Sequence, residues 1–395
     1  MRACDIVYVS AVPWTSQRQR PHAIALELAR RYRVLYVNSV VRSLPGLVRD
    51  AWKLGWAQVR PRAEEIAPNL VLLQPWPLLP GACSVETANH VNATFTARQI
   101  ASFLGESAGP FLLWLATPWA AALIPELRPA RTCYDCMDLI PAFYRGHTRT
   151  LVEKLEATVL RGSDFVFASS QILFDRCRAV NNNVHLVRNG VWVEQYQFRS
   201  EVPVDLRPLP RPLLGYVGTI GPWMEWSLLA ALANAFPQAS VVLIGPMHDP
   251  ARLRGLPVNV HWLGSKPQAE VASYIAAFDV CLIPFVQDEL SAAVNPVKFY
   301  EHCAAGRPTV SVPLPELQAH AQLCYLGGTA DEFVAATRLA LAEAADQEHQ
   351  QAAVKARRQL AAENSWSAQG QRIRRVLEAA VPPQAAWQAE APCRL

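Results

Sequence analysis

The segment that begins at Asn295 limits the fold most, because it carries the start and stop signals of a helix and then a strand. Asn295 and Pro296 suit the N-cap and the first position of a helix, and Gly306 suits the left-handed residue past its end. The β-branched run 309–312 predicts a strand. Since the apolar run 280–285 precedes the helix, the order is strand, loop, helix, strand. This order is typical of a parallel α/β sheet.

Two charged residues of this helix indicate an anionic ligand. Lys298 lies in the first turn, where a cation opposes the helix dipole by a few tenths to about 1 kcal/mol. Glu301 follows one turn later on the same face. A helix N-terminus beside the carboxyl end of a strand favours phosphate groups, so a diphosphate could bind Lys298 and a ribose could reach Glu301. The alternative is a solvent-exposed Lys–Glu pair worth about 0.2–0.5 kcal/mol.

The run Asn-Pro-x-Lys-Phe-Tyr-Glu-His-x-Ala-Ala-Gly-Arg-Pro-x-Val-Ser, residues 295–311, resembles the donor-nucleotide motif of glycosyltransferase family 4. These enzymes are retaining glycosyltransferases with the GT-B fold. The resemblance implies that Glu301 binds the ribose of a nucleotide sugar. It also implies that the loop and helix start from Ala293 through Asn295, Pro296 and Val297 hold the diphosphate.

One departure from the family motif concerns the donor sugar. The family has paired glutamates eight positions apart, and the first of them falls on Ala293 in this chain. Because that glutamate contacts the sugar in the family, the resemblance leaves the sugar undefined. Glu289 lies four residues earlier, and we do not expect it to substitute.

A glycine turn is predicted to complete the donor side. The apolar strand 213–217 runs into Gly218-Thr219-Ile220-Gly221, where glycines let the backbone approach a diphosphate and offer N–H groups. Many family members have a basic residue near this loop, and this chain has none there, which adds weight to Lys298. Arg188 begins Arg-Asn-Gly-Val, similar to the Pro-Asn-Gly-Val that closes the family's first domain, and it could reach the interdomain cleft.

Three residues of the first half, Trp14, Arg20 and His22, are predicted on the acceptor side, and Asp138 is predicted in the same cleft. Trp14 with Arg20-Pro21-His22 resembles the opening of a subgroup that makes bacterial surface polysaccharides such as teichuronic acid. For the basic residues the alternative is plain solubility. The segment 134–138 resembles the family's Tyr-Asp-x-x-Asp, so that Asp138 would face the cleft and orient an acceptor hydroxyl or hydrogen-bond a donor sugar. A loop or helix-capping aspartate is its alternative, and a lone DxxD is a weak metal signal, so no metal is predicted.

The whole chain of 395 residues reads as two Rossmann-like domains, the α/β architecture called GT-B, with parallel sheets facing a cleft. The predicted parts are a first domain 1–196, a proline-rich linker 197–212, a nucleotide-sugar-binding domain 213–365, a helix 366–381 crossing back to the first domain, and a disordered tail 382–395. Strands of the first domain are predicted at 6–9, 34–37, 70–73, 111–115, 132–135, 164–170 and 184–187.

Composition limits the partners and the compartment. The net charge of +4 gives no case for nucleic acid. No apolar run reaches the roughly 18 residues that span a bilayer, and no signal-peptide pattern opens the sequence. The odd count of nine scattered cysteines predicts a reducing cytoplasm. We expect Cys133-x-x-Cys136 to be structural thiols; a redox pair or half a zinc site is the alternative.

The segment 42–62 is basic and aromatic, with Val48, Trp52, Trp56 and Val59 at helical spacing. Such a helix could lie on an anionic membrane surface, which would place the protein at the inner face of the cytoplasmic membrane. The alternative is a helix packed on its own domain, with its basic side chains extended to solvent.

The sequence therefore predicts a retaining, metal-independent glycosyltransferase without a cofactor. It would transfer a sugar from a nucleoside-diphosphate sugar, most simply a UDP-sugar, to a hydroxyl of a glycan or lipid-linked acceptor. Lys298 and Asp138 are the candidate catalytic residues, and no catalytic base is assigned. A catalytically degenerate scaffold subunit and a sugar-nucleotide 2-epimerase are the alternatives. A dinucleotide oxidoreductase is disfavoured, since no GxGxxG follows a strand.

Overall fold

The structure is a computed structural model that describes residues 5–10, 12–38, 62–76, 79, 81–105, 109–197, 201–345 and 347–380. The chain divides into two compact units. The first runs to Arg188 and resumes at Gln369, and the second is Asn189–Ala368. The predicted membrane-surface segment 42–62, apart from Arg62, and the predicted tail 382–395 lie outside the described residues.

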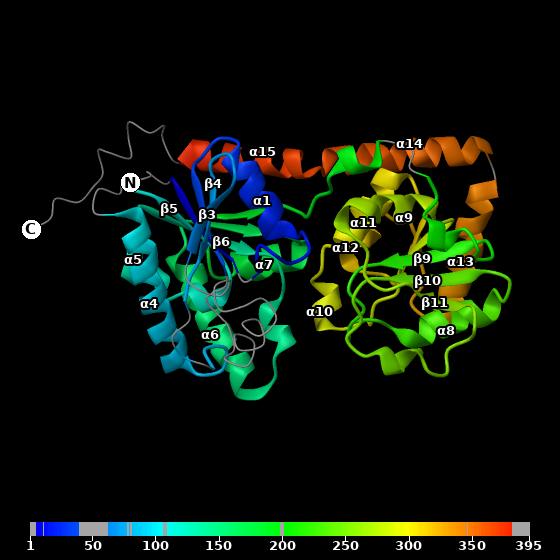
Figure 1. The fold of residues 1–395 in the computed structure, drawn as a ribbon, viewed down its shortest axis with the longest axis horizontal. Helices are drawn as coiled ribbons and strands as arrows, with labels where there is room; N and C mark the ends of the chain where they lie inside the picture. The colour runs from blue at the N-terminus through cyan, green and yellow to red at the C-terminus, as the bar shows by residue number, and fades with distance from the viewer. Residues whose placement is uncertain are drawn as a thin grey trace, which may run out of the picture. The chain divides into compact units, whose positions relative to one another are not determined.

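The first unit contains an eight-stranded sheet in the order β3-β4-β2-β1-β5-β6-β7-β8 (Figure 1). Its strands are parallel except β3, which is antiparallel to β4. The strands are β1 (Ile6–Ser10), β2 (Val34–Val37), β3 (Arg62–Ala67), β4 (Leu70–Gln74), β5 (Leu112–Ala116), β6 (Arg131–Cys136), β7 (Phe165–Ala168) and β8 (Val184–Leu186). The described helices are α1 (Arg20–Ala29), α4 (Glu86–Leu104), α5 (Leu123–Leu127), α6 (Gly146–Gly162) and α7 (Gln171–Arg178), with most of α15 (Trp366–Ala380).

The predicted strands of this unit are found within a few residues of their expected ends, because they are apolar runs buried on both faces. Four of the described helices and strands of this unit were not predicted, namely β3, α4, α5 and α7. β3 is an exposed edge strand of sequence RAEEIA, which has no apolar alternation. α4 buries mostly alanine, asparagine and threonine side chains, with large apolar ones only at Ile100 and Leu104 near its end, so its apolar period is weak.

The second unit contains a six-stranded parallel sheet in the order β11-β10-β9-β12-β13-β14. The strands are β9 (Leu213–Val217), β10 (Ser240–Ile244), β11 (Val260–Trp262), β12 (Val280–Ile283), β13 (Thr309–Ser311) and β14 (Tyr325–Leu326). The described helices are α8 (Trp226–Ala235), α9 (Val271–Ala277), α10 (Glu289–Ala292), α11 (Val297–Ala305), α12 (Pro315–Gln318), α13 (Ala330–Ala345) and α14 (Gln347–Glu363).

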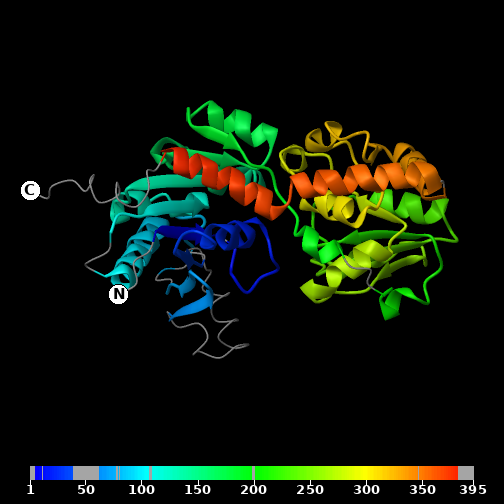
Figure 2. The same cartoon turned by 90° about the horizontal axis from the view of Figure 1, so that it is seen from above.

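Alternate residues of this sheet face two separate cores. Leu214 and Tyr216 of β9 pack with α8, α11 and α13, whereas Leu213 and Val217 pack with α9. α14 lies alongside α11 in both views (Figures 1 and 2). Both faces of the sheet are therefore covered, which leaves its edges for ligands.

The units divide after Arg188 and not after residue 196, where the sequence placed the end of the first domain. The reason is that residues 189–191 are bonded inside the second unit. The Val191 N–H donates to the Asn364 carbonyl at 3.1 Å, and the Trp366 N–H donates to the Val191 carbonyl at 3.1 Å. From Gln369 on, α15 packs in the first unit, where Arg374 donates to the Glu27 carbonyl at 2.8 Å.

Candidate functional site

Lys298 of the second unit lies directly against Gly218. A Cβ atom built on Gly218, whose φ is +144°, would lie 2.5 Å from both Cε and Nζ of Lys298, so only glycine leaves room for the ammonium. Nζ lies 5.3 Å from the ring centroid of Tyr216 and 6.0 Å from that of Phe285, within the range of cation–π attraction. The turn after β9 and the first turn of α11 thus meet at a positive charge.

Lys298 forms no ion pair with any carboxylate among the residues that the structure describes, Glu301 included. The solvent-exposed Lys–Glu pair, which was the alternative interpretation of this helix, is therefore not formed. A half-buried ammonium at a helix N-terminus and a glycine turn is an arrangement that favours a bound anion.

Fewer backbone N–H groups are available here than the sequence predicted. Gly218 and Ile220 already donate to the carbonyls of Ile244 and Pro246, each at 2.8 Å. Only Thr219 and Gly221 of that turn have N–H groups without a partner among the described residues. The expectation that the whole turn 218–221 offers its amides is wrong for half of it, because these residues continue the pairing of the sheet past β9.

The loop before α11 also has fewer unpaired N–H groups than the sequence predicted. Ala293 and Val294 donate their N–H groups to Leu290 and Ser291, at 3.1 and 3.2 Å, and Pro296 has none. Val297, the first residue of α11, keeps the unpaired N–H of a helix start. The amides without a partner among the described residues therefore include those of Val297 and Lys298, in the first turn of α11, and those of the two residues named in the 218–221 turn.

Asn295 is not the helix cap that the sequence predicted, since Pro296 occupies the N-cap position. Its amide oxygen accepts from the Asn189 N–H at 2.9 Å, and its amide nitrogen donates to Glu316 at 2.8 Å and to the Tyr300 hydroxyl at 3.0 Å. Asn295 is buried, and its side chain binds the protein itself. We therefore withdraw it as a ligand contact, and it holds the start of α11 in place.

Glu301 projects from the second turn of α11 into a partly buried environment. Burial raises the pKa of its carboxyl group, and the nearby Lys298 charge partly offsets the effect. Tyr196 lies close enough to feel this carboxylate, because burial first and the Glu301 charge second raise the pKa of its hydroxyl. Tyr196 was not predicted, and only its place a few residues after the Asn-Gly turn could have suggested it.

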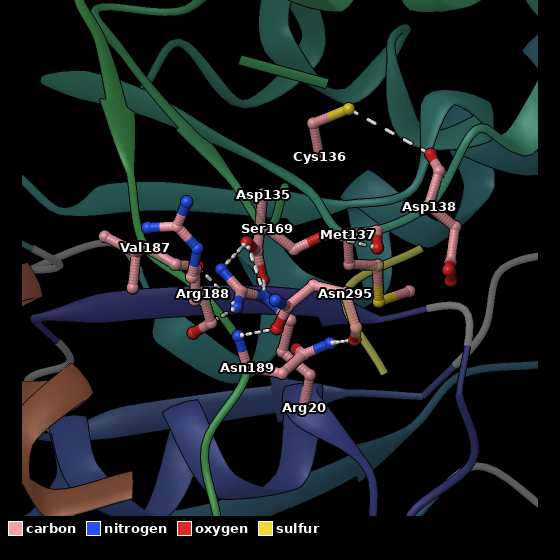
Figure 3. A network of polar contacts seen from close by, with 10 residues as sticks. All are labelled: Arg20, Asp135, Cys136, Met137, Asp138, Ser169, Val187, Arg188, Asn189 and Asn295. Carbon is pink, nitrogen blue, oxygen red and sulfur yellow. Dashed lines mark hydrogen bonds and ion pairs between the residues drawn. The ribbon is translucent and has the colours of Figure 1, made fainter. Parts of the chain in front are cut away.

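In the first unit, Arg20 is buried and bound to Asp135. Nε and Nη2 donate to Asp135 Oδ1 at 3.0 and 2.7 Å, and Nη1 donates to the carbonyls of Val187 and Arg188 at 2.8 and 3.2 Å (Figure 3). With 4% of its side chain exposed, Arg20 does not face a ligand. This placement does not support its predicted acceptor-side role, because its guanidinium is already paired with Asp135, 115 residues away in the chain.

His22 is also internal. Its Nδ1 accepts from the Gln19 N–H at 3.0 Å, which leaves Nε2–H to donate to the Pro13 carbonyl at 3.1 Å. Burial lowers the pKa of its imidazole, so the ring stays neutral at pH 7. Trp14 is half-buried, its ring 5.1 Å from that of His22 and 4.9 Å from that of Tyr36. This placement does not support the predicted acceptor-side role of His22 either, because both of its ring nitrogens are hydrogen-bonded to the backbone.

Asp138 behaves differently from these neighbours. Its carboxyl group lies apart from the Arg20–Asp135 pair in Figure 3 and has no partner among the described residues. Burial, with a smaller contribution from Asp135, raises its pKa to about 7 against the attraction of Arg20. Asp138 follows β6, at the carboxyl edge of the sheet, where α/β folds bind ligands.

The remaining predicted residues have mixed placements. Arg188 is half-buried and contributes its carbonyl to Arg20. Cys133 and Cys136 are free, buried thiols of β6. Glu289 is exposed at the start of α10. Within the described part of the chain, no group of three or more His, Cys, Asp or Glu side chains could hold a metal ion.

Comparison with known proteins identifies the class. Residues 211–344 match the family described as glycosyl transferases group 1. TuaH of Bacillus subtilis, named for a glycosyltransferase role in teichuronic acid biosynthesis, is 26% identical over 277 residues, which cover 65% of this chain and 68% of TuaH.

Solved structures agree on the fold. Sucrose-phosphate synthase of Thermosynechococcus elongatus has a TM-score of 0.72 at 16% identity, covering 96% of this chain and 99% of that one. Anabaena HepE in complex with UDP and glucose has a TM-score of 0.65 at 15% identity, covering 95% and 100%.

The two parallel-sheet units are those of the GT-B fold, as predicted. The chain carries a group 1 glycosyl transferase domain and is a glycosyltransferase, which confirms the resemblance found in residues 295–311.

The Arg20–Asp135 pair gives a stability prediction. Arg20→Met leaves Asp135 buried and unpaired, so we expect a loss of about 3–5 kcal/mol in unfolding free energy. Arg33→Met is the matched control, since Arg33 pairs with Asp5 at 2.8 Å with 46% of its side chain exposed. That control should lose only about 0–1 kcal/mol. Urea unfolding monitors both, and equal losses would contradict the structural role of Arg20.

Proposed function

We propose that this glycosyltransferase is retaining and metal-independent and uses a nucleoside-diphosphate sugar, with UDP-sugars favoured, to glycosylate a hydroxyl of a glycan or lipid-linked acceptor. One observation carries the proposal: the unpaired Lys298 ammonium fills the space beside Gly218, at the start of α11. A diphosphate supplies the negative charge that this position lacks.

On the donor side, the diphosphate would lie at Lys298 and the free N–H groups of Val297, Thr219 and Gly221. Negative charge grows on the leaving diphosphate in the transition state, and preorganised donors at that point lower the barrier. Glu301, one turn further along α11, would accept hydrogen bonds from the ribose hydroxyls. The UDP bound by HepE supports this choice of nucleotide.

On the acceptor side, Asp138 is the residue that we propose to contact the substrate. With a pKa of about 7, its carboxyl group is partly ionised at neutral pH and can accept a hydrogen bond from the attacking hydroxyl. The relation to TuaH supports a cell-surface polysaccharide or glycoconjugate as the acceptor. We assign no catalytic base, and with Ala293 in the first glutamate position we specify no donor sugar.

The location that we propose is the cytoplasm, at the inner face of the membrane. No described helix is long and apolar enough to cross a membrane. We propose that contact through 42–62 is peripheral, with the tryptophans in the interface and the basic side chains on anionic headgroups.

The donor site is tested by calorimetric titration with UDP, GDP, ADP and TDP in the presence of a metal chelator. We expect one nucleotide, UDP, to bind, and Glu301→Ala and Lys298→Ala to weaken it about 10- to 100-fold, since a hydrogen bond to a charged group contributes about 1.5–3 kcal/mol. Gly218→Ala should weaken it too, because the new methyl group displaces the Lys298 ammonium.

Gly255→Ala is the control for that last variant. Gly255 also has a positive φ, +86°, but a Cβ there meets nothing within 4 Å. A Gly255→Ala effect as large as that of Gly218→Ala would argue for backbone strain alone. Folded protein that binds none of the four nucleotides would instead support a degenerate scaffold subunit. Where transfer occurs, the anomeric configuration of the product decides between retention and inversion.

Asp138 gives a pH prediction with a defined sign. The folded-state pKa of about 7 lies above the ordinary 3.8, so the folded protein keeps a proton that the unfolded chain releases. Stability should therefore fall as pH rises from about 4 to about 7. Between pH 5 and pH 8, we expect the melting temperature of Asp138→Asn to fall less than that of the parent protein.

The same residue should control activity if its carboxylate receives the acceptor. In that case kcat/KM falls about tenfold per pH unit below about 7, and Asp138→Asn abolishes this dependence together with most of the rate. If Asp138→Asn keeps the parental kcat/KM and the same decrease at acidic pH, Asp138 does not contact the acceptor.

Membrane contact is tested with the full chain and sedimented vesicles. Vesicles with an anionic lipid should retain the protein, and neutral vesicles should not. Replacing Arg49, Lys53 and Arg60 by Gln should release it, since each basic residue near an anionic surface contributes about 1 kcal/mol. The same number of Gln replacements at Arg252, Arg254 and Arg338 is the control, and equal release by both sets would refute a role for 42–62.

A further inference from the structure

A pocket of about 550 Å³ opens in the second unit, away from the residues assigned to the donor. Arg211, Asp279 and Pro308 line it, and they precede β9, β12 and β13. It therefore lies at the amino edge of the sheet, whereas the Gly218 turn follows the carboxyl end of β9. Its volume falls in the range of small-molecule sites, roughly 300–1,000 Å³.

The charges that line the pocket leave an excess of two positive groups. Arg211 pairs with Asp279 at 2.7 Å, and Glu343 is taken by the two terminal nitrogens of Arg357, each at 2.6 Å. These two pairs cancel. Arg307 and Arg358 are not neutralised by a carboxylate in the described part of the chain.

Two helices end at this pocket, and their negative ends oppose an anion. α9 ends at Ala277 and α11 at Ala305. Two arginines partly neutralise the negative end of α9. Arg211 donates to the Ala277 carbonyl at 3.1 Å, and Arg307 donates to the Ala276 carbonyl. Each guanidinium has five N–H donors, so these contacts leave donors over. Arg358 is exposed and donates to no helix-end carbonyl in the described part of the chain.

Two positive charges match a phosphate monoester, which carries about −1.5 to −2 at pH 7, better than they match a single carboxylate. Guanidinium groups also suit phosphate oxygens by their planar geometry. Because the pocket is larger than an inorganic phosphate needs, its ligand should carry an organic part. The side chains of Tyr196, Val202 and Val354 form a less polar part of the pocket wall, which that organic part could contact.

The pocket is connected to the donor residues by two elements. Tyr196 lines it and also lies within the electrostatic reach of Glu301. Ala305 and Gly306 line it at the end of α11, the helix that carries Lys298 and Glu301 near its start. A ligand that shifts either element alters the donor site.

We propose that this pocket binds a small organic phosphate and that its occupancy changes nucleotide affinity through Tyr196 and α11. The second part rests on the proposed donor site, and the first part does not.

The test is a calorimetric titration of the full chain with a hexose monophosphate and, separately, with inorganic phosphate. The hexose monophosphate should bind more tightly than inorganic phosphate. Arg358→Gln should weaken it about tenfold or more, as the loss of one charge-assisted hydrogen bond does. Arg254→Gln, another exposed arginine of the same unit outside the pocket, should not. Equal melting temperatures of the two variants establish that both are folded.

Several outcomes would overturn the site. These are no binding by the parent chain, equal weakening in both arginine variants, or loss of binding in Glu301→Ala, which would put the phosphate in the donor site. For the coupling, UDP affinity is measured with and without the saturating hexose monophosphate. By linkage the two ligands must change each other's affinity equally, and an unchanged UDP affinity refutes the coupling. Phosphate binding through Arg358 in a chain that binds no nucleotide would refute the proposed donor and leave the pocket standing.

Discussion

The donor side of the second unit depends on the hydrogen bonds of one buried side chain, that of Asn295. Its amide oxygen accepts from the Asn189 N–H, and its amide nitrogen donates to the Tyr300 hydroxyl and the Glu316 carboxylate. The side-chain amide of Asn189 donates in turn to the backbone carbonyl of Asn295 at 2.6 Å. A buried polar group left without a partner costs about 1–3 kcal/mol. The loop before α11 therefore has one strongly favoured arrangement. Lys298 and Glu301 take their positions from it, since both lie in the first two turns of the helix that follows.

That arrangement keeps the two charges of α11 apart. An i,i+3 pair would have satisfied Lys298 and Glu301 with each other. Instead the ammonium lies over the rings of Tyr216 and Phe285, and the carboxyl group lies where burial raises its pKa. Burial of the Glu301 carboxyl group costs free energy that a ligand's hydrogen-bond donors can offset, and the Lys298 ammonium, with no carboxylate partner among the described residues, can pair with an anion. A nucleoside diphosphate presents both polarities, anionic oxygens for the lysine and ribose hydroxyls for the glutamate.

The sequence predicted elements whose apolar period is strong and whose boundaries carry special residues. Gly306 ends α11 in the left-handed conformation as expected, and the last helix was placed at its observed start. The sequence did not predict α4, whose buried face is mostly small or polar, or β3, whose edge position needs no apolar face. The contact of Lys298 with Gly218 could only be suspected, because it joins residues 80 positions apart whose loops meet only after the sheet forms.

The same limit decides which motif residues can touch a substrate. Arg20 and His22 are basic residues beside a strand end, and nothing local tells that Asp135 and two backbone carbonyls occupy the first, or that Gln19 and Pro13 occupy the second. A polar side chain whose hydrogen bonds are all made inside the fold cannot bind a ligand without breaking them. Among the predicted acceptor residues, Asp138 keeps a charged group without a partner in the described structure. We therefore expect acceptor recognition in the first unit to centre on this carboxyl group. The Arg20–Asp135 ion pair holds the end of β6 in place.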